Sequence, residues 1–175
     1  MTIQSSRASH DDRPLPDIRL RDPMPGDIGL IISGQARLYA AEYGWDQTFE
    51  ALVAEIAARF IRDFQPGFER CWVADHAGQV VGSAFVVRHA DEGTAQLRML
   101  YVDPAARGHG LGARLVDACI GFARQAGYRR MVLWTNDILV SARRIYEARG
   151  FRLDAEERHH SFGHDLVGQF WSRPL

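Results

Sequence analysis

Arg107-Gly108-His109-Gly110-Leu111-Gly112 stands between an apolar extended segment that ends at Val102 and a segment of helical periodicity, 111–126. Glycines at alternate positions let a backbone approach a ligand without clashes from Cβ atoms. The first N–H groups of the following helix are free to bind a ligand, and the helix dipole favours an anion beside them. Arg107 can add a charge-assisted hydrogen bond. The stretch therefore predicts a strand–loop–helix unit that binds a pyrophosphate.

Other glycine-rich loops fit this stretch less well. A P-loop needs Gly-Lys-Ser/Thr, which the stretch does not contain. A dinucleotide-binding loop has the spacing G-x-G-x-x-G after the first strand of a βαβ unit, whereas these glycines have the spacing G-x-G-x-G and follow a predicted hairpin. A flexible loop at a glycine-rich helix start, without a ligand, is an alternative that the stretch alone leaves open.

Hydrophobic periodicity and turn residues predict the elements on either side of this loop. In chain order we expect a strand at 18–21, helices at 28–41 and 47–63, strands at 71–75, 80–88 and 95–102, a helix at 111–126, a strand at 130–135, a helix at 141–149, and strands at 151–157 and 166–171. Asp46 is placed to cap the second helix. Hairpins join the middle strands and helices join the later ones, which predicts a mixed sheet with helices packed on its faces.

Length and composition are those of an ordinary soluble domain. The chain has 175 residues, of which 46% are hydrophobic and 25% charged. We expect one domain over residues 18–175, preceded by a flexible leader at 1–17 that is rich in polar residues and proline. Cys71 and Cys119 lie in apolar stretches, which favours buried thiols in a reducing compartment over a disulfide framework.

Charge and hydropathy argue against several classes of partner. The formal net charge of -1 indicates no nucleic-acid binding. No apolar run approaches the roughly 20 residues that span a bilayer, and the N-terminus has no apolar signal core. We therefore expect a cytoplasmic protein with no nucleic-acid partner and no membrane contact, and we allow for a homodimer.

The glycine stretch resembles a known motif. Arg107-x-x-Gly110-x-Gly112, after a strand and at the start of a helix, is similar to the coenzyme A motif of the GNAT superfamily of N-acetyltransferases, and the likeness runs from about Ile18 to the C-terminus. The resemblance implies an α/β (α+β) fold: a mixed, mostly antiparallel sheet of about six to seven strands with helices on both faces. It implies acetyl-CoA as co-substrate and no metal. The resemblance places the thioester end along backbone groups of Leu100, Tyr101 and Val102, and the phosphates on Arg107, Gly108, His109, Gly110, Leu111 and Gly112.

A second stretch resembles the other GNAT signature. Leu133-Trp134-Thr135-Asn136 ends a predicted strand, and the next helix carries Ala142 and Tyr146 before Gly150-Phe151. By this resemblance Asn136 and Ala142 contact the coenzyme, and the Tyr146 hydroxyl faces the thioester sulfur. A phenol with a pKa near ~10 can protonate a leaving thiolate, whose acid has a pKa near ~8.5, only if the two touch. Tyr146 is thus the candidate general acid, and a packing residue with a solvated hydroxyl is the alternative.

The general base is harder to place. Many family members carry a carboxylate on the strand before the glycine loop, but Gln96-Leu97-Arg98-Met99-Leu100-Tyr101-Val102 has none. Glu42, on the first predicted helices that help to wall the acceptor site in this family, is the leading candidate. A carboxylate on a solvated helix surface is the alternative reading of Glu42. His159, His160 and His164 complete no known metal-ligand spacing, and we expect them on a loop near the mouth of the acceptor site.

A narrower likeness concerns two segments. Residues 39–56 and 159–169 resemble the acetyltransferase half of bacterial proteins that fuse a MarR-type DNA-binding domain to a GNAT domain. The sequence thus predicts an N-acetyltransferase that moves an acetyl group from acetyl-CoA to a primary amine of a small molecule, amino acid or peptide by direct attack on the thioester. A catalytically silent acyl-CoA sensor is the alternative.

Overall fold

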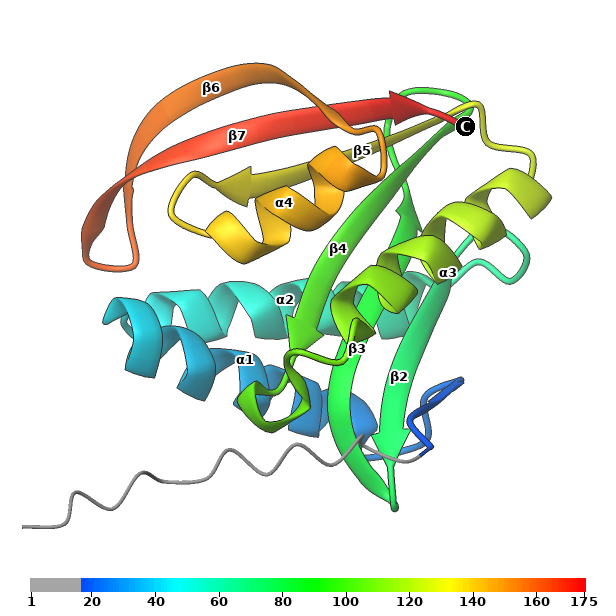
Figure 1. Cartoon of the computed structure of the whole chain (residues 1–175). Helices are drawn as coiled ribbons and strands as arrows, with labels where there is room; N and C mark the ends of the chain where they lie inside the picture. Colours follow the sequence, from blue (N-terminus) through cyan, green and yellow to red (C-terminus); the bar gives the residue numbers. More distant parts are fainter. Residues whose placement is uncertain (1–16) are drawn as a thin grey trace, which may run out of the picture.

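The computed structural model describes residues 17–175, and its centre is one seven-stranded sheet in the order β1-β2-β3-β4-β5-β7-β6. Within the described residues, β4 and β5 are the one parallel pair, and every other neighbouring pair is antiparallel (Figure 1). The predicted mixed, mostly antiparallel sheet is confirmed. The elements are β1 (Arg19–Arg21), α1 (Asp27–Tyr43), α2 (Gln47–Asp63), β2 (Arg70–His76), β3 (Gln79–Arg88), β4 (Thr94–Val102), a short 3-10 turn (Pro104–Ala106), α3 (Leu111–Gln125), β5 (Arg130–Asn136), α4 (Val140–Ala148), β6 (Arg152–Ser161) and β7 (His164–Pro174).

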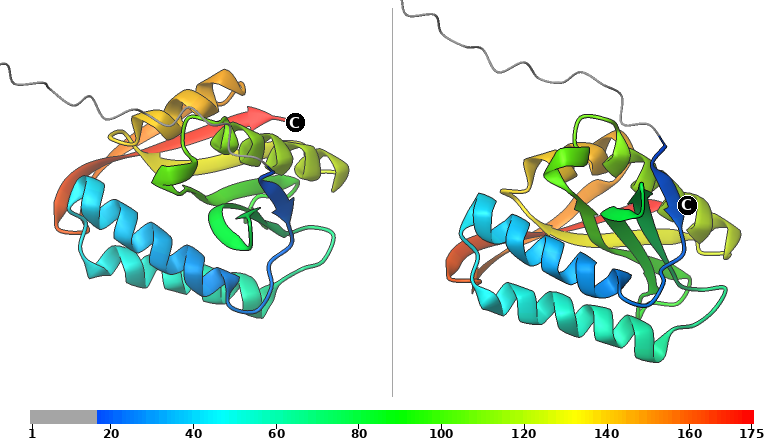
Figure 2. Two further views of the ribbon diagram at one scale, coloured as in Figure 1. Left: turned by 60° about the horizontal axis from the view of Figure 1, so that its bottom comes forward. Right: turned by 90° about the horizontal axis from the view of Figure 1, so that it is seen from below.

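Helices cover both faces of the sheet, as predicted. The pair α1 and α2 lies on one face and the pair α3 and α4 on the other (Figures 1 and 2). Alternation along a strand sends successive side chains to opposite faces. On β2, Val73 packs with Ile31 of α1, whereas Trp72 and Ala74 pack with the apolar side of α3. The two cores are therefore built from the same strands, and both are continuous with the middle of the sheet.

A β-bulge bends β4 and separates it from β5. Arg98 pairs with Phe85 and Tyr101 with Ser83, so two residues of β4 stand where β3 supplies one. Met99 has a φ of 51°, a left-handed conformation that is uncommon for a residue other than glycine. Pairing between β4 and β5 ends at Gln96, and the two strands diverge beyond it (Figure 1). Within residues 17–175, the edge of β4 after Gln96 therefore has no strand partner on the β5 side.

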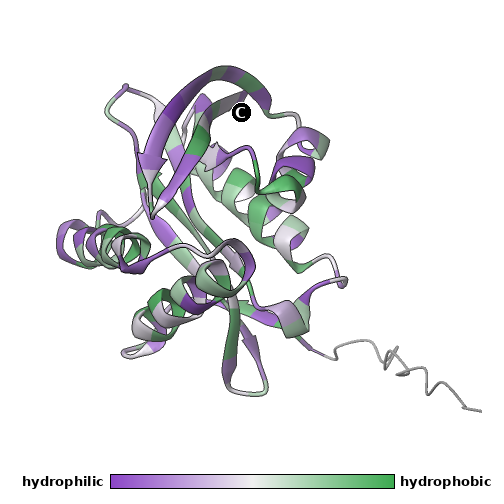
Figure 3. Ribbon diagram, turned by 90° about the vertical axis from the view of Figure 1, so that its left-hand side faces the viewer, coloured by the Kyte–Doolittle hydropathy of each residue, from purple (hydrophilic) through white to green (hydrophobic). Residues whose placement is uncertain are grey.

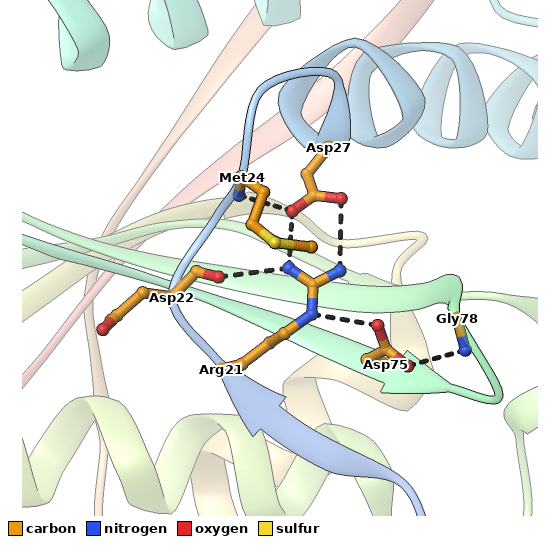
Figure 4. Close-up of polar contacts among 6 residues, drawn as sticks. All are labelled: Arg21, Asp22, Met24, Asp27, Asp75 and Gly78. Atoms are coloured by element: carbon orange, nitrogen blue, oxygen red, sulfur yellow. Dashed lines mark hydrogen bonds and ion pairs between the residues drawn. The ribbon is translucent and has the colours of Figure 1, made fainter.

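An ion-pair cluster at the start of the fold ties β1, α1 and β2 together (Figure 4). Arg21 donates from Nη1 and Nη2 to the carboxylate of Asp27, at 2.6 and 3.2 Å, and from Nε to Asp75 at 2.9 Å. Asp27 is buried and also accepts from the Met24 amide at 2.6 Å. The Arg21 guanidinium holds the pKa of Asp27 below its usual range. These contacts fix the first turn of α1 against the edge of the sheet.

The β6–β7 hairpin is longer than predicted. The expected loop around the three late histidines is wrong: His159 and His160 lie in β6, just before its last residue, and His164 begins β7. The hairpin turns at Phe162-Gly163, both with positive φ, which is the geometry of a two-residue β-turn. Polar residues can continue this strand because β6 is the outermost strand of the sheet and almost fully exposed; it is coloured mostly hydrophilic in Figure 3.

The tip of this hairpin docks on the turn between α1 and α2, as both views of Figure 2 show. The amide of Asp46 donates to the carbonyl of Phe162 at 3.2 Å, and His164 Nε2 lies 3.0 Å from the carbonyl of Gly44. The Trp45 and Phe162 rings pack with their centroids 4.7 Å apart. The hairpin thus connects the β5-β7-β6 end of the sheet to helices α1 and α2.

Several local expectations also agree with the structure. Asp46 caps α2 by accepting from the Thr48 amide at 2.9 Å, and Cys71 and Cys119 are buried free thiols. The proposed leader lies outside the described residues, except for Asp17. Over residues 17–175, no helix is long and apolar enough to cross a membrane.

Candidate active site

The glycine loop presents a row of free amides. Gly108 and Gly110 have φ values of 82° and 71°, and a Cβ atom at either would meet no atom within 4 Å. The first backbone hydrogen bond of α3 runs from Arg114 to the carbonyl of Gly110. Among the described residues, the amides of residues 108–113 therefore have no backbone acceptor. Such a cluster at a helix N-terminus attracts phosphate oxygens.

Gly112 serves a different purpose from the other two glycines. A Cβ atom there would lie 2.8 Å from Cδ1 of Ile145 and 3.6 Å from Val102. Gly112 therefore lets α3 and α4 approach each other closely, in addition to leaving its amide free. The alternating pattern, which the sequence suggested was all for ligand approach, combines two backbone requirements with one packing requirement.

Arg107 and Glu42 form an ion pair across the mouth of this loop. Arg107 Nη1 lies 2.6 Å from Glu42 Oε1, and the pair raises the pKa of Arg107. Glu42 belongs to α1, so the contact connects the helical layer on one face of the sheet to the glycine loop. Both side chains are part-exposed, which means that the contact itself contributes little to stability.

A cavity of about 330 Å³ opens over the free amides. It runs from the glycine loop along the unpaired edge of β4 to the start of α4. Most residues that the sequence assigned to the coenzyme line this cavity: Leu100, Tyr101, Val102, Arg107, Gly108, Gly110, Leu111, Gly112 and Ala142. Glu42 lines it as well. His109 does not, and its Nδ1 instead lies 2.8 Å from the carbonyl of Arg107.

A second cavity, of about 150 Å³, lies between α1, α2 and the divergent ends of β4 and β5. The two cavities share Tyr39, Leu100, Leu139 and Ala142, which mark the place where they meet. Aromatic rings form much of the wall; Tyr39 packs against Trp45 and Phe49 with centroids 4.9 and 4.7 Å away. This second cavity is where Asn136 and Tyr146 lie, and Glu42 does not line it.

Tyr146 reaches the second cavity from α4. Its side chain is 5% exposed and packs on Phe151, and its hydroxyl has no hydrogen-bond partner among the described residues. Burial raises the pKa of Tyr146 above its ordinary value. The phenol is therefore protonated at neutral pH, and its hydroxyl is free to donate a hydrogen bond to a group in the cavity.

Asn136 is held by His159, which the sequence placed near the acceptor site but on a loop and without a contact to Asn136. Asn136 is buried at the end of β5, and its Oδ1 lies 2.9 Å from Nε2 of His159. The other ring nitrogen of His159 lies 2.9 Å from the Ser161 hydroxyl, and the ring packs near Trp134. When Nε2 of His159 donates to Oδ1 of Asn136, Nδ1 can accept from the Ser161 hydroxyl, and this chain of contacts fixes the orientation of the Asn136 amide.

The comparisons with known proteins agree with this architecture. Residues 36–151 match the sequence profile of the Acetyltransferase (GNAT) family. The chain belongs to the GNAT family of acetyltransferases. An uncharacterized N-acetyltransferase of Schizosaccharomyces pombe is 36% identical over 115 residues, which cover 65% of this chain and 70% of the relative. The N-acetylaspartate synthetase of Danio rerio is 35% identical over 57% of this chain, but the match covers only 34% of its length.

A solved structure of the GNAT superfamily has the same fold. The phosphinothricin acetyltransferase of Sinorhizobium meliloti, crystallised with AcCoA, superposes with a TM-score of 0.73 over 90% of this chain and 88% of its own, at 26% identity. The glycine loop and the divergence of β4 from β5 thus stand in a fold that GNAT proteins share.

Sequence reasoning gave no role to several polar residues of the second cavity, among them Gln35, Gln96 and Arg98. Arg98 carried one signal, a charge between Leu97 and Met99 in an otherwise apolar strand. Within residues 17–175, no aspartate or glutamate lines this cavity, and no group of three or more potential metal ligands occurs.

Proposed function

We propose that this GNAT protein transfers the acetyl group of acetyl-CoA to a primary amine by direct attack on the thioester. The observation that carries the proposal is the connection between the two cavities. One cavity offers free amides for phosphates, and the other holds an unpartnered phenol beside the point where the two meet. The AcCoA complex of the phosphinothricin acetyltransferase supports the same coenzyme here.

In this proposal the coenzyme lies along the first cavity. The amides of residues 108–113 and the Arg107 guanidinium bind the phosphates. The unpaired edge of β4 at Leu100, Tyr101 and Val102 offers backbone groups to the pantetheine arm, in the manner of an added strand. The thioester then lies at the junction, near Ala142 and within reach of the second cavity.

The reaction forms one C–N bond and breaks one C–S bond. The amine nitrogen attacks the thioester carbonyl from the second cavity and loses a proton, and the sulfur leaves as a thiolate. Tyr146 gives its proton to that thiolate; it lines the second cavity one helical turn beyond Ala142, which lies at the junction. Asn136, oriented by His159, supplies an amide at the same end of the cavity.

Glu42 remains our candidate for the general base, and its position suggests a second role. It lies on the coenzyme side, paired with Arg107, whereas the amine enters from the other side. A proton from the attacking nitrogen would therefore reach Glu42 through water at the junction. Alternatively, Glu42 positions Arg107 over the phosphates. The two roles differ in which kinetic constant they affect.

A sensor that binds acyl-CoA without turnover is the competing function. The likeness of residues 39–56 and 159–169 to the acetyltransferase half of MarR–GNAT fusions favours it, as does the lack of a carboxylate among the described residues of the second cavity. The unpartnered phenol favours the enzyme, because a sensor needs no proton donor at the thioester. We further propose a cytoplasmic location, and we allow for a homodimer.

Thiol release separates the two functions. Purified protein is mixed with acetyl-CoA and a panel of primary amines, and free coenzyme A is titrated over time, with calorimetric binding of acetyl-CoA measured on the same preparation. The proposal expects amine-dependent release with at least one acceptor class. Tight binding with no release above the amine-free rate across the panel would favour the sensor instead.

A further inference from the structure

Arg98 is an uncompensated cation in the wall of the second cavity. It lies in the middle of β4, beside the bulge at Met99, and its register partner is Phe85, which packs against α1 and α2. Among residues 17–175 it forms no ion pair and no side-chain hydrogen bond. Burial lowers the pKa of Arg98, and the charge of nearby Arg59 acts in the same direction.

Such an arrangement is costly without a partner. A guanidinium that is partly removed from water loses hydration, and proteins normally offset that loss with a carboxylate or with carbonyl groups. Arg59 does have a carboxylate, since its Nη2 lies 3.4 Å from Glu55 on the exposed side of α2. Arg98 has no counterpart of this kind in the part of the chain that the structure describes, and its side chain lines the cavity where the amine would bind.

Gln35 is a second, independent observation. It projects from α1 into the same cavity, is only 3% exposed, and forms no side-chain hydrogen bond to any described residue. Its amide atoms are not among the fully buried side-chain atoms that lack a partner in residues 17–175, so they are open to the cavity and can bind a ligand there. Gln96, two residues before Arg98 on the same strand, lines the cavity too, and its side chain is likewise free of protein hydrogen bonds within residues 17–175.

We infer that Arg98, with Gln35 beside it, binds a carboxylate of the acceptor, so that the acceptor is a free amino acid. This inference rests on the proposed acetyl transfer and assigns its substrate class. A carboxylate offers two oxygens in one plane, which match the fork of a guanidinium, and an amide donor can bind a remaining lone pair. The charge of the acceptor would then supply the missing partner of Arg98.

The size of the site limits the distance between the amine and the carboxylate. Arg98 and Tyr146 line one cavity of about 150 Å³, well below the roughly 300–1,000 Å³ of sites for drug-sized ligands. The amine must lie near Tyr146 and the junction, and the carboxylate near Arg98. A free amino acid has both groups a few atoms apart. A peptide N-terminus has an amide where the amino acid has its α-carboxylate, so it leaves Arg98 unpaired.

The test compares matched acceptors and matched variants. The twenty common L-amino acids are assayed for thiol release, and each substrate is paired with its α-amide and its decarboxylated amine. Aspartate and glutamate are paired with asparagine and glutamine as well, which separates an α-carboxylate from a side-chain carboxylate. Variants are Arg98→Gln, Arg98→Lys and the control Arg59→Gln, which removes the same charge from an exposed neighbour outside the cavity.

We expect the wild-type protein to have a higher kcat/KM for the free acid than for its α-amide. Because a hydrogen bond to a charged group is lost, Arg98→Gln should lower kcat/KM for the acid by about 10- to 150-fold and leave the amide unchanged. Arg98→Lys should recover part of the loss, and Arg59→Gln should behave as wild type. Since Arg98 has no partner to lose among the described residues, the variant should fold, which its circular dichroism and its unchanged acetyl-CoA affinity would verify.

Failure of the carboxylate site and failure of acetyl transfer give different results. Efficient acetylation of amides and simple amines, or an Arg98→Gln enzyme that retains its preference for acids, would overturn the carboxylate site and leave acetyl transfer intact. Without turnover on any amine, calorimetry with the same amino acids and amides, in the presence of coenzyme A, provides the second readout. If the wild-type protein binds an amino acid and Arg98→Gln does not, the carboxylate site is supported even though the enzyme proposal fails. Equal binding of acids and amides would refute the carboxylate site.

Discussion

Replacing Gly110 by aspartate tests the phosphate-binding loop most sharply. The residue stands between the free amides of Gly108 and Leu111 and has a φ of 71°. A Cβ atom at this position would meet nothing within 4 Å, so the side chain has room, although a left-handed backbone strains most residues other than glycine. The new carboxylate would project beside the place where the phosphates are proposed to bind.

The expected loss of acetyl-CoA affinity follows from charge repulsion. Two like charges about 4 Å apart repel by about 4 kcal/mol at an effective dielectric constant near 20, and screening at an exposed loop reduces this value. We expect a net loss of about 1–3 kcal/mol, or about 5- to 150-fold weaker acetyl-CoA binding. Isothermal titration calorimetry at two salt concentrations would measure the affinity, and the loss should shrink at the higher concentration.

Two control variants isolate the charge from other effects. Asparagine has nearly the same shape as aspartate, and it tolerates the left-handed region. Gly110→Asn should therefore bind acetyl-CoA nearly as tightly as wild type. Gly121→Asp adds the same charge to α3 away from the loop, where a Cβ atom also meets nothing within 4 Å. Equal affinity of Gly110→Asp and Gly110→Asn would refute the placement of the phosphates at this loop.

Two further variants address the base and the N-terminal ion-pair cluster. Glu42→Gln should lower kcat/KM most at low pH if Glu42 takes the proton of the amine, whereas a raised KM for acetyl-CoA with a wild-type pH–rate profile would show that Glu42 only positions Arg107. Asp27→Asn should cost about 1.5–3 kcal/mol of unfolding free energy at pH 7, because the pair with Arg21 is charge-assisted. The pKa of Asp27 is lowered in the folded state, so its contribution to stability is present above the unfolded pKa near ~3.9 and is lost as the pH falls through the folded pKa. In urea unfolding, the free energies of wild type and variant should therefore converge in acid. A constant difference between the two down to pH 2 would contradict this role.

Local signals predicted most of the fold. The elements follow from periodicity and from turn residues such as Gly44 and Gly127, and their bounds differ from the structure mainly at the ends. The bulge at Met99 had no such signal, because a positive φ at methionine is imposed by the pairing of β3 with β4. The extended hairpin at His159 and His164 was missed because contacts with the distant α1–α2 turn, rather than local propensity, stabilise it.

The sequence likewise predicted only part of the candidate site. The loop at 107–112 is contiguous in the sequence, and its free amides follow from a helix that begins there. Tyr146 and Asn136 were placed by resemblance, and their roles remain predictions. Gln35 and Arg98 come from a helix and a strand far apart in the chain, and only the packing of α1 over β4 brings them to one cavity. Periodicity cannot reveal that an arginine lacks a partner, because its partner is defined by the fold.

Tyr146→Phe tests the central claim, acetyl transfer with a phenol as general acid. The substitution removes one oxygen and keeps the ring against Phe151, so packing should be little changed. General acid catalysis contributes about 10²–10⁴-fold, and water can replace part of it, so we expect kcat to fall at least about tenfold with acetyl-CoA affinity nearly unchanged. The measurement is the single-turnover rate of amine acetylation, with calorimetric affinity on the same preparations. A Phe variant that acetylates at the wild-type rate would contradict the account.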